Sequence, residues 1–211
     1  MSDAGREGHW QSVYTSKAEN SVSWFEAEPA VSLALIVLTG TPEDAAVIDI
    51  GGGASRLVDR LLERGFGDVT VLDLSAAALD AARARIGASA AQVQWIVADV
   101  TTWEPPRRYA LWHDRAALHF LTDPTDRDAY LARLRRALLP GGHAIIGTFA
   151  PDGPARCSGL PVQRYDAESL SAALGPEFEL LDSRRHTHVT PAGAEQRFHF
   201  GTLRRRPVRA P

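Results

Sequence analysis

The stretch Val47-Ile48-Asp49-Ile50-Gly51-Gly52-Gly53 decides the fold of this 211-residue chain. A short apolar run at 46–50 leads directly into three glycines, which is typical of a buried parallel strand followed by a tight turn. Apolar residues between 57 and 62 then recur at helical spacing until the glycines at 65 and 67. The stretch therefore predicts a strand, a turn and a helix in immediate succession.

The same unit recurs along the chain. The pattern predicts a strand at 69–73, then a helix with Ser75 as its N-cap, then strands at 93–98 and 109–113. A helix is expected from Asp123-Pro124 to the break at 140–142, followed by a strand at 143–149. The last part predicts a helix at 166–174 and a hairpin formed by 177–187 and 196–204. Together these elements predict an α/β fold, with a doubly wound, mostly parallel, seven-stranded Rossmann-like sheet and an antiparallel terminal hairpin.

One domain is expected over residues 1–211, because the length lies within the usual range of a single domain. Residues 1–40 form an N-terminal cap of one or two helices over the ligand edge, 45–150 form the core, and 151–211 supply a substrate loop and the hairpin. The cap carries Trp10, Tyr14 and Trp24, and the loop at 151–164 has the breakers of a segment able to close over a ligand.

Composition excludes several classes of protein. The chain is 45% hydrophobic with a net charge of -3, and its one basic cluster, at 204–209, is read as a solvated tail, so we expect no nucleic-acid partner. No apolar run approaches the roughly 18 residues of a membrane span, and no signal-peptide pattern is present, so we expect a cytoplasmic protein without a membrane partner. The single cysteine, Cys157, excludes an internal disulfide, and no Cys/His pattern predicts a metal site.

Acidic residues stand at the ends of the first three predicted strands. Asp49 lies in the first strand, Asp73 ends the second, and Asp99 follows the third. Parallel strands bring these ends to one edge of the sheet, where ligands of such folds bind. Asp73 suits a ribose diol, and Asp99 with Val100 suits an adenine. Each acid alone is more often a turn or capping residue, but the set predicts a nucleoside site.

The motifs around these acids resemble the seven-strand (class I) S-adenosylmethionine-dependent methyltransferases. They are Val47-Ile-Asp-Ile-Gly-Gly-Gly, Val71-Leu-Asp-Leu-Ser, Val97-Ala-Asp-Val and Leu139-Pro-Gly-Gly-His. The resemblance implies S-adenosylmethionine as cofactor, with Gly51 and Gly53 beside its methionine and ribose and Asp49 near its amino group. It also implies that Asp73, with Leu74 after it, binds the ribose and that Asp99 and Val100 bind adenine. Tyr14 and Trp24 are expected as aromatic walls facing the sulfonium.

Candidates for the acceptor site follow the fourth strand. They are His113, Asp114 and Arg115, with His119 beyond them, and His113 has the most suitable intrinsic pKa for a base. The alternative is that His113 is a packed strand residue and Asp114 a helix cap. Methyl transfer requires alignment more than acid-base help, so no catalytic group is obligatory.

We expect a methyltransferase acting on a small molecule by in-line displacement, with a protein lysine as the alternative acceptor. The resemblance at 10–25 to the capping segment of eukaryotic lysine methyltransferases keeps that alternative open. A non-catalytic cofactor-binding protein is a third reading. A nicotinamide dehydrogenase is disfavoured, because its third glycine would fall at Arg56.

Overall fold

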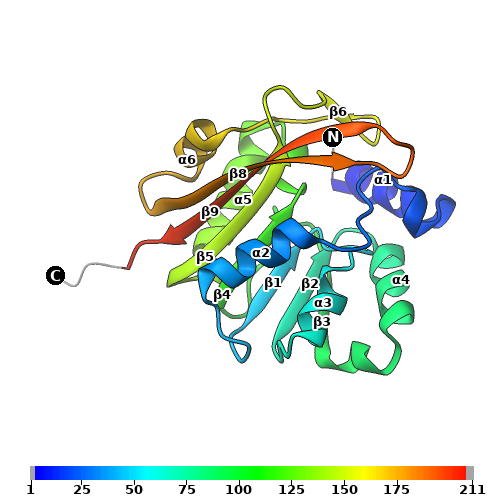
Figure 1. Cartoon of the computed structure of the whole chain (residues 1–211), viewed down its shortest axis with the longest axis horizontal. Helices are drawn as coiled ribbons and strands as arrows, with labels where there is room; N and C mark the ends of the chain where they lie inside the picture. Colours follow the sequence, from blue (N-terminus) through cyan, green and yellow to red (C-terminus); the bar gives the residue numbers. More distant parts are fainter. Residues whose placement is uncertain (1–2, 208–211) are drawn as a thin grey trace.

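A computed structural model describes residues 3–207, with side chains from residue 5. Its main feature is a seven-stranded sheet in the order β3-β2-β1-β4-β5-β9-β8 (Figure 1). The strands are β1 (Val47–Ile50), β2 (Val69–Asp73), β3 (Val93–Val97), β4 (Tyr109–Arg115), β5 (Leu138–Phe149), β8 (Phe178–Val189) and β9 (Glu195–Arg205). β1 to β5 are parallel, whereas β9 pairs antiparallel with both β5 and β8. The predicted sheet with its terminal antiparallel hairpin is confirmed.

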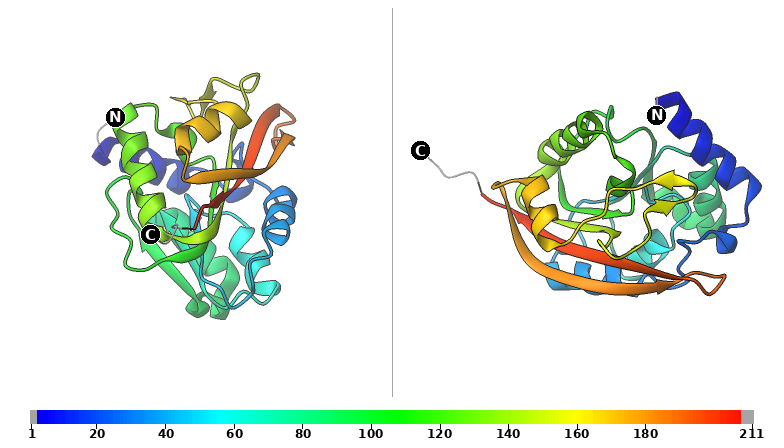
Figure 2. Two further views of the ribbon diagram at one scale, coloured as in Figure 1. Left: turned by 90° about the vertical axis from the view of Figure 1, so that its left-hand side faces the viewer. Right: turned by 90° about the horizontal axis from the view of Figure 1, so that it is seen from above.

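Helices cover both faces of this sheet (Figure 2). α2 (Ala30–Thr39), α3 (Leu57–Glu63) and α4 (Ala76–Ile86) pack on one face, and α5 (Pro124–Ala137) and α6 (Ala167–Leu174) on the other. β1 shows how one strand serves both layers. Val47 belongs to the cluster with α2 and α3, while Ile48 and Ile50 belong to the cluster with α5, as alternation along a strand requires.

The N-cap residues predicted from the sequence cap the helices in the structure. The Ser75 hydroxyl accepts the N–H of Ala78 at the start of α4, and Asp123 accepts the N–H of Thr125 at the start of α5. Each side chain satisfies a donor that the first helical turn leaves unpaired. The predicted helix starts are confirmed at both positions.

α1 (Asp3–Ser16) lies over the carboxyl ends of the parallel strands, at the same end of the molecule as the small hairpin β6 (Arg156–Cys157) and β7 (Leu160–Pro161) (Figures 1 and 2). The predicted cap is thus formed by α1 and the segment after it, which contains the 3-10 helix η1 (Glu19–Ser21). The prediction was wrong for α2. That helix packs Leu33 and Ile36 on the sheet, because its apolar side chains match the face at β5, and its Ser32 meets His113 of β4. Two further 3-10 helices are η2 (Gly87–Gln92) and η3 (Leu118–Phe120).

The predicted boundaries of β4, α5 and β5 were wrong. β4 continues past His113, and Asp114 and Arg115 pair with Ile146 and Gly147 of β5. α5 ends at Ala137, because Leu138 already has extended backbone angles (φ −83°, ψ 135°). The segment 140–142 therefore lies inside β5 and does not end the helix.

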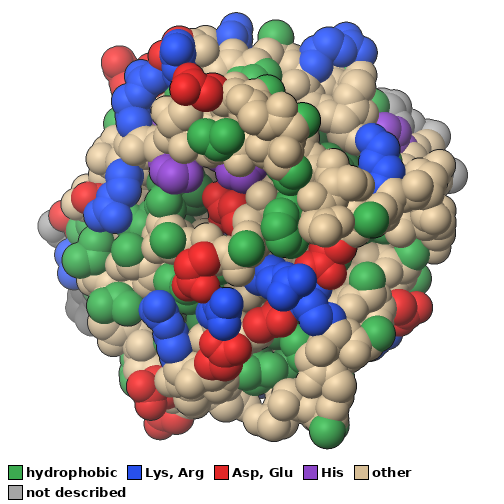
Figure 3. Space-filling view, turned by 45° about the vertical axis from the view of Figure 1, so that its right-hand side comes forward, with side chains coloured by type: hydrophobic (Ala, Val, Ile, Leu, Met, Phe, Trp, Pro, Cys, Tyr) green, Lys and Arg blue, Asp and Glu red, His purple; other side chains and the backbone are tan. Residues whose placement is uncertain are grey.

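Charged side chains of both signs are interspersed on the face that includes α1 and the hairpin tip (Figure 3). Among the described residues, no helix is long and apolar enough to cross a membrane.

Candidate functional site

Two adjoining cavities lie at the carboxyl edge of the sheet, where the strand order reverses between β1 and β4. The larger, here called the main cavity, extends from the ends of β2 and β3 to β5 and β9. The smaller, the side cavity, lies beside the glycine turn. They share Tyr14, Trp24, Gly51 and Arg115. This edge is where doubly wound sheets bind ligands.

The cavities contain most of the residues predicted from the sequence. The main cavity is lined by Tyr14, Trp24, Gly51, Asp73, Leu74, Asp99, Val100 and Arg115, and the side cavity adds Asp49 and His113. Gly53 and Asp114 are not among the lining residues of either cavity.

The glycine turn requires residues without side chains. Gly51 and Gly53 have φ of 64° and 46°, a region that other residues rarely adopt. A Cβ added to Gly51 would lie 2.9 Å from Cβ of Ala117. One added to Gly53 would lie 3.0 Å from both Oδ2 of Asp73 and the hydroxyl of Tyr14. The turn thus keeps the backbone close to β2, α1 and the segment after β4.

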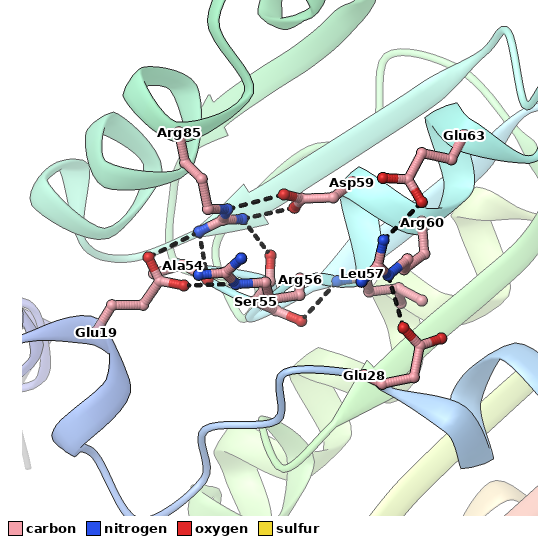
Figure 4. Close-up of polar contacts among 10 residues, drawn as sticks. All are labelled: Glu19, Glu28, Ala54, Ser55, Arg56, Leu57, Asp59, Arg60, Glu63 and Arg85. Atoms are coloured by element: carbon pink, nitrogen blue, oxygen red, sulfur yellow. Dashed lines mark hydrogen bonds and ion pairs between the residues drawn. The ribbon is translucent and has the colours of Figure 1, made fainter.

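A network of charged residues supports this turn from outside (Figure 4). Arg85 of α4 donates to the carbonyl oxygen of Ala54 at 2.9 Å and forms a two-pronged pair with Asp59, at 2.9 and 2.7 Å. Glu19 lies 3.0 Å from both Arg85 and Arg56. The bidentate Arg85–Asp59 pair holds α4 against α3 beside the turn, and Glu19 joins this network to the N-terminal cap.

Asp73 presents a buried carboxylate to the main cavity. Its Oδ1 accepts the N–H of Ser75 at 2.8 Å. Burial, together with the neighbouring Asp49, raises the pKa of Asp73 to about 7, although the hydrogen bond from Ser75 lowers it. Any ligand that donates hydrogen bonds to Asp73 therefore stabilises its ionised form.

Asp99 already accepts four hydrogen bonds. Its Oδ1 accepts the N–H and hydroxyl of Thr101, at 2.8 and 2.7 Å, and its Oδ2 accepts Nε and Nη2 of Arg6, at 3.2 and 2.8 Å. Burial raises the pKa of Asp99, but the hydrogen bonds from Thr101 and Arg6 outweigh it and lower that pKa overall. An adenine amine could reach this carboxylate only by displacing one of these donors. The adenine role of Asp99 stays a prediction.

Arg6 connects α1 to two parts of the core. Besides Asp99, its guanidinium contacts Asp126 in α5 at 2.5 Å. The side chain also lines the main cavity. The sequence does not indicate this residue, because an arginine on an N-terminal helix carries no signal of its partner on a strand end 93 residues away.

His113 has both ring nitrogens engaged. Nδ1 lies 2.7 Å from Oδ1 of Asp49, and Nε2 lies 2.9 Å from Oγ of Ser32 in α2. The ring is buried between β1 and α2. A role as general base would require one of these bonds to break, so that role stays a prediction.

Asp114 stabilises the turn after β4. It is fully buried and accepts the N–H groups of Ala117 and Leu118, at 2.8 and 3.0 Å, and the hydroxyl of Tyr130 at 2.7 Å. Burial raises its pKa to about 6. This matches the capping alternative more closely than the acceptor-site prediction, since the side chain faces the protein interior. It also positions Ala117 against Gly51.

Arg115 closes the site between the cap and the hairpin. Its Nη1 donates to the Trp24 carbonyl at 2.9 Å, Nη2 lies 2.9 Å from Oε1 of Glu26, and the guanidinium lies 5.2 Å from the ring centre of Phe198. His188 of β8 is 3.5 Å from the same Glu26 oxygen. The loop at 22–29 is therefore tied to both β4 and the hairpin.

Aromatic rings enclose the remaining part of the main cavity. Trp10 packs edge-on against Trp24 and Phe120, with ring centres 5.6 and 4.9 Å apart, and Trp24 donates its indole N–H to the Tyr14 hydroxyl at 3.2 Å. Phe149 lines the same cavity. The predicted positions of Tyr14 and Trp24 at the cavity agree with the structure, while their contacts with a ligand stay predictions.

The hairpin contributes walls that the sequence did not indicate, because Phe198 and Gln196 of β9 line the main cavity. Cys157 of β6, within the segment 151–164 that was predicted to close over a ligand, lines it as well. Burial raises the pKa of the Cys157 thiol to about 11, which keeps it protonated and weakly reactive. His119 is fully buried, and burial lowers its pKa to about 3. Among the described residues, no group of three or more His, Cys, Asp or Glu could hold a metal ion.

Comparison with known proteins identifies a family for the core of the chain. Residues 47–142 match the model of a family described as a methyltransferase domain. Nodulation protein S of Rhizobium tropici is 27% identical over 124 residues, which is 59% of this chain and 51% of that protein. The match therefore spans about half the length of this curated relative.

Solved structures extend the likeness to nearly the whole chain. A 1,6-didemethyltoxoflavin N1-methyltransferase from Burkholderia thailandensis, with bound 1,6-didemethyltoxoflavin and S-adenosylhomocysteine, has a TM-score of 0.68 and 25% identity, covering 96% of this chain and 85% of that one. The N-methyltransferase NodS from Bradyrhizobium japonicum, in complex with S-adenosylhomocysteine, has a TM-score of 0.70 and 17% identity, covering 93% and 98%.

Residues 47–142 therefore match a methyltransferase domain, and the chain has the fold of class I S-adenosylmethionine-dependent methyltransferases. The fold class, the family and the cofactor predicted from the sequence are confirmed.

Proposed function

We propose that this protein transfers a methyl group from S-adenosylmethionine to a small-molecule acceptor held in the aromatic part of the main cavity. The observation that carries the proposal is the enclosure of that part. α1, the loop at 22–29 and the hairpin surround it, and Arg115 ties that loop to β4 and packs on the hairpin. An enclosed, mostly apolar chamber suits a small ligand better than a side chain on a folded protein.

The cofactor fits the opposite part of the same cavity. The positive-φ glycine turn leaves room beside Gly51, and the buried Asp73 carboxylate has capacity to accept from ribose hydroxyls. Leu74 and Val100 provide apolar walls for the base. We propose these contacts as the adenosyl site, with Asp49 toward the methionine end, where it is held by His113.

The chain's own groups then act by positioning. When bound, the cofactor would supply a methyl group on a sulfonium; an acceptor lone pair would bond to the methyl carbon as the opposite carbon–sulfur bond breaks, with S-adenosylhomocysteine as the leaving group. Tyr14 and Trp24 exclude water and present ring faces or edges to the reacting centre. The acids lining the main cavity are Asp73 and Asp99, both at its adenosyl end. The acceptor is therefore expected to arrive with a free lone pair.

The test has two parts. Calorimetry should show binding of S-adenosylhomocysteine and none of NAD; the reverse result would overturn the cofactor site. Labelled methyl groups should then pass from S-adenosylmethionine into the small-molecule fraction of a cell extract. Label found only in the dialysed protein fraction, on lysine, would favour the alternative, and no transfer at all would favour the non-catalytic reading.

Removing residues 1–25 tests the enclosure itself. It deletes Trp10, Tyr14 and Trp24, so turnover should fall by about tenfold or more while the circular dichroism of the sheet persists. Full activity of the shortened protein would contradict an enclosed acceptor site.

A further inference from the structure

Gln196 lies in the wall of the main cavity, and its carboxamide oxygen is unpaired among the described residues. The residue lies at the start of β9 and is 9% exposed. Its amide oxygen Oε1 is buried and has no hydrogen-bond partner among the described residues. Buried polar groups are nearly always paired, because an unpaired one loses its hydrogen bonds to water and gains none within the protein. The fold thus positions the Gln196 side chain but leaves its amide oxygen without a hydrogen-bond donor.

The surroundings of Gln196 are flat and apolar. Phe198 lies two residues further along β9 and therefore on the same face of the strand. Its ring packs 4.9 Å from that of Phe149, and both line the main cavity. Trp10 and Phe120 line it as well. Rings of this kind favour a planar ligand, which can pack against their faces and edges.

The charges around this part of the cavity disfavour a cationic acceptor. The charged group next to Phe198 is the guanidinium of Arg115, and the charge of Arg115 is balanced by Glu26. The carboxylates that line the main cavity, Asp73 and Asp99, stand at its opposite end. An ammonium group would lose its hydration beside Gln196 without meeting an opposite charge.

A carboxamide carries an acceptor oxygen and a donor nitrogen side by side in one plane. Its complement is an edge with a donor beside an acceptor, such as the N–H and C=O of a lactam. We propose that Gln196 is the specificity-determining residue for the methyl acceptor, and that the acceptor is a flat, uncharged heterocycle with a lactam edge. This inference rests on the proposed function, because it assumes that the acceptor occupies the aromatic part of the main cavity.

The test uses two probes of the same bicyclic shape. Quinazolin-4(3H)-one has the lactam edge, and quinazoline lacks it. Each is titrated into the full-length protein saturated with S-adenosylhomocysteine, with binding followed by ligand-observed NMR. The wild type should bind the lactam about tenfold more tightly or better, as expected for one satisfied pair of hydrogen bonds.

Gln196→Leu removes the carboxamide at nearly constant size. The preference for the lactam should fall below about twofold, and S-adenosylhomocysteine affinity should stay within about twofold of the wild type. The melting temperature without ligand should stay equal or rise, because the substitution removes an unpaired polar group. Gln94→Leu, at an exposed position of β3, is the matched control and should leave the preference intact.

Three results would overturn the proposal: no binding of either probe, equal binding of both by the wild type, or an undiminished preference in Gln196→Leu. A marked drop in the melting temperature of Gln196→Leu would also do so, since it would assign Gln196 a structural role. Loss of S-adenosylhomocysteine binding by the wild type would instead refute the proposed function.

Discussion

Cofactor affinity should depend on pH through Asp73. The unliganded carboxyl group has a pKa raised to about 7 by burial, so it is increasingly protonated below that pH. Ribose hydroxyls donate to the ionised form and thereby lower its pKa in the complex. Affinity should consequently be greatest above about pH 8 and fall about tenfold for each pH unit below 7, reaching about 100-fold at pH 5.

Substitution of Asp73 measures how much its charge contributes to cofactor affinity. Asp73→Ala removes two charge-assisted hydrogen bonds to the ribose, which corresponds to roughly 2–4 kcal/mol, or about 30- to 1000-fold in affinity. Asp73→Asn keeps an oxygen for the N–H of Ser75 but carries no charge. Its affinity should be low at every pH and show no dependence between about pH 5 and 8.

The assay is calorimetric titration with 5′-methylthioadenosine as well as S-adenosylhomocysteine. The first ligand carries the ribose and adenine without an amino acid, so a pH dependence common to both ligands belongs to the protein's nucleoside site. A flat profile in the wild type, or an unchanged slope in Asp73→Asn, would refute the reasoning. A loss below about threefold in Asp73→Ala would make Asp73 only a turn residue.

Three further substitutions test other parts of the site. Gly51→Val should abolish S-adenosylhomocysteine binding, because a β-branched residue does not tolerate φ of 64°. The control Gly67→Ala, where an added Cβ meets open space, should bind normally. Normal binding by folded Gly51→Val would exclude the turn described here. Arg6→Ala should lower the free energy of unfolding in urea by roughly 1–3 kcal/mol, since it removes the cation that donates two hydrogen bonds to the half-buried Asp99 carboxylate; adding Asp99→Asn should restore part of the loss, and a loss below about 0.5 kcal/mol would contradict the anchoring of α1. His113→Ala should reduce the single-turnover rate of methyl transfer more than the affinity for S-adenosylhomocysteine, and equal effects on both would argue against a role near the reacting atoms.

The sequence by itself determined the sheet and its ligand edge. The glycine turn at 51–53, the caps Ser75 and Asp123, and the acids at the strand ends are local signals, readable within one or two turns of chain. Parallel strands with right-handed crossovers leave few topologies, so local elements nearly dictate where Asp73 stands.

Only the tertiary structure decided which partner each polar group meets. Arg6 donates to Asp99, Asp49 and Ser32 lie within hydrogen-bond distance of the ring nitrogens of His113, and Oε1 of Gln196 has no partner among the described residues. These pairings join α1, α2 and the hairpin to strands that are remote in the chain. Hydrophobic periodicity specifies which face of an element is buried, but it carries no information about the side chain that approaches from another element. The location of the site could therefore be predicted from the order of the strands and the glycine turn. The enclosure of the proposed acceptor site could not, because it depends on how remote elements pack together.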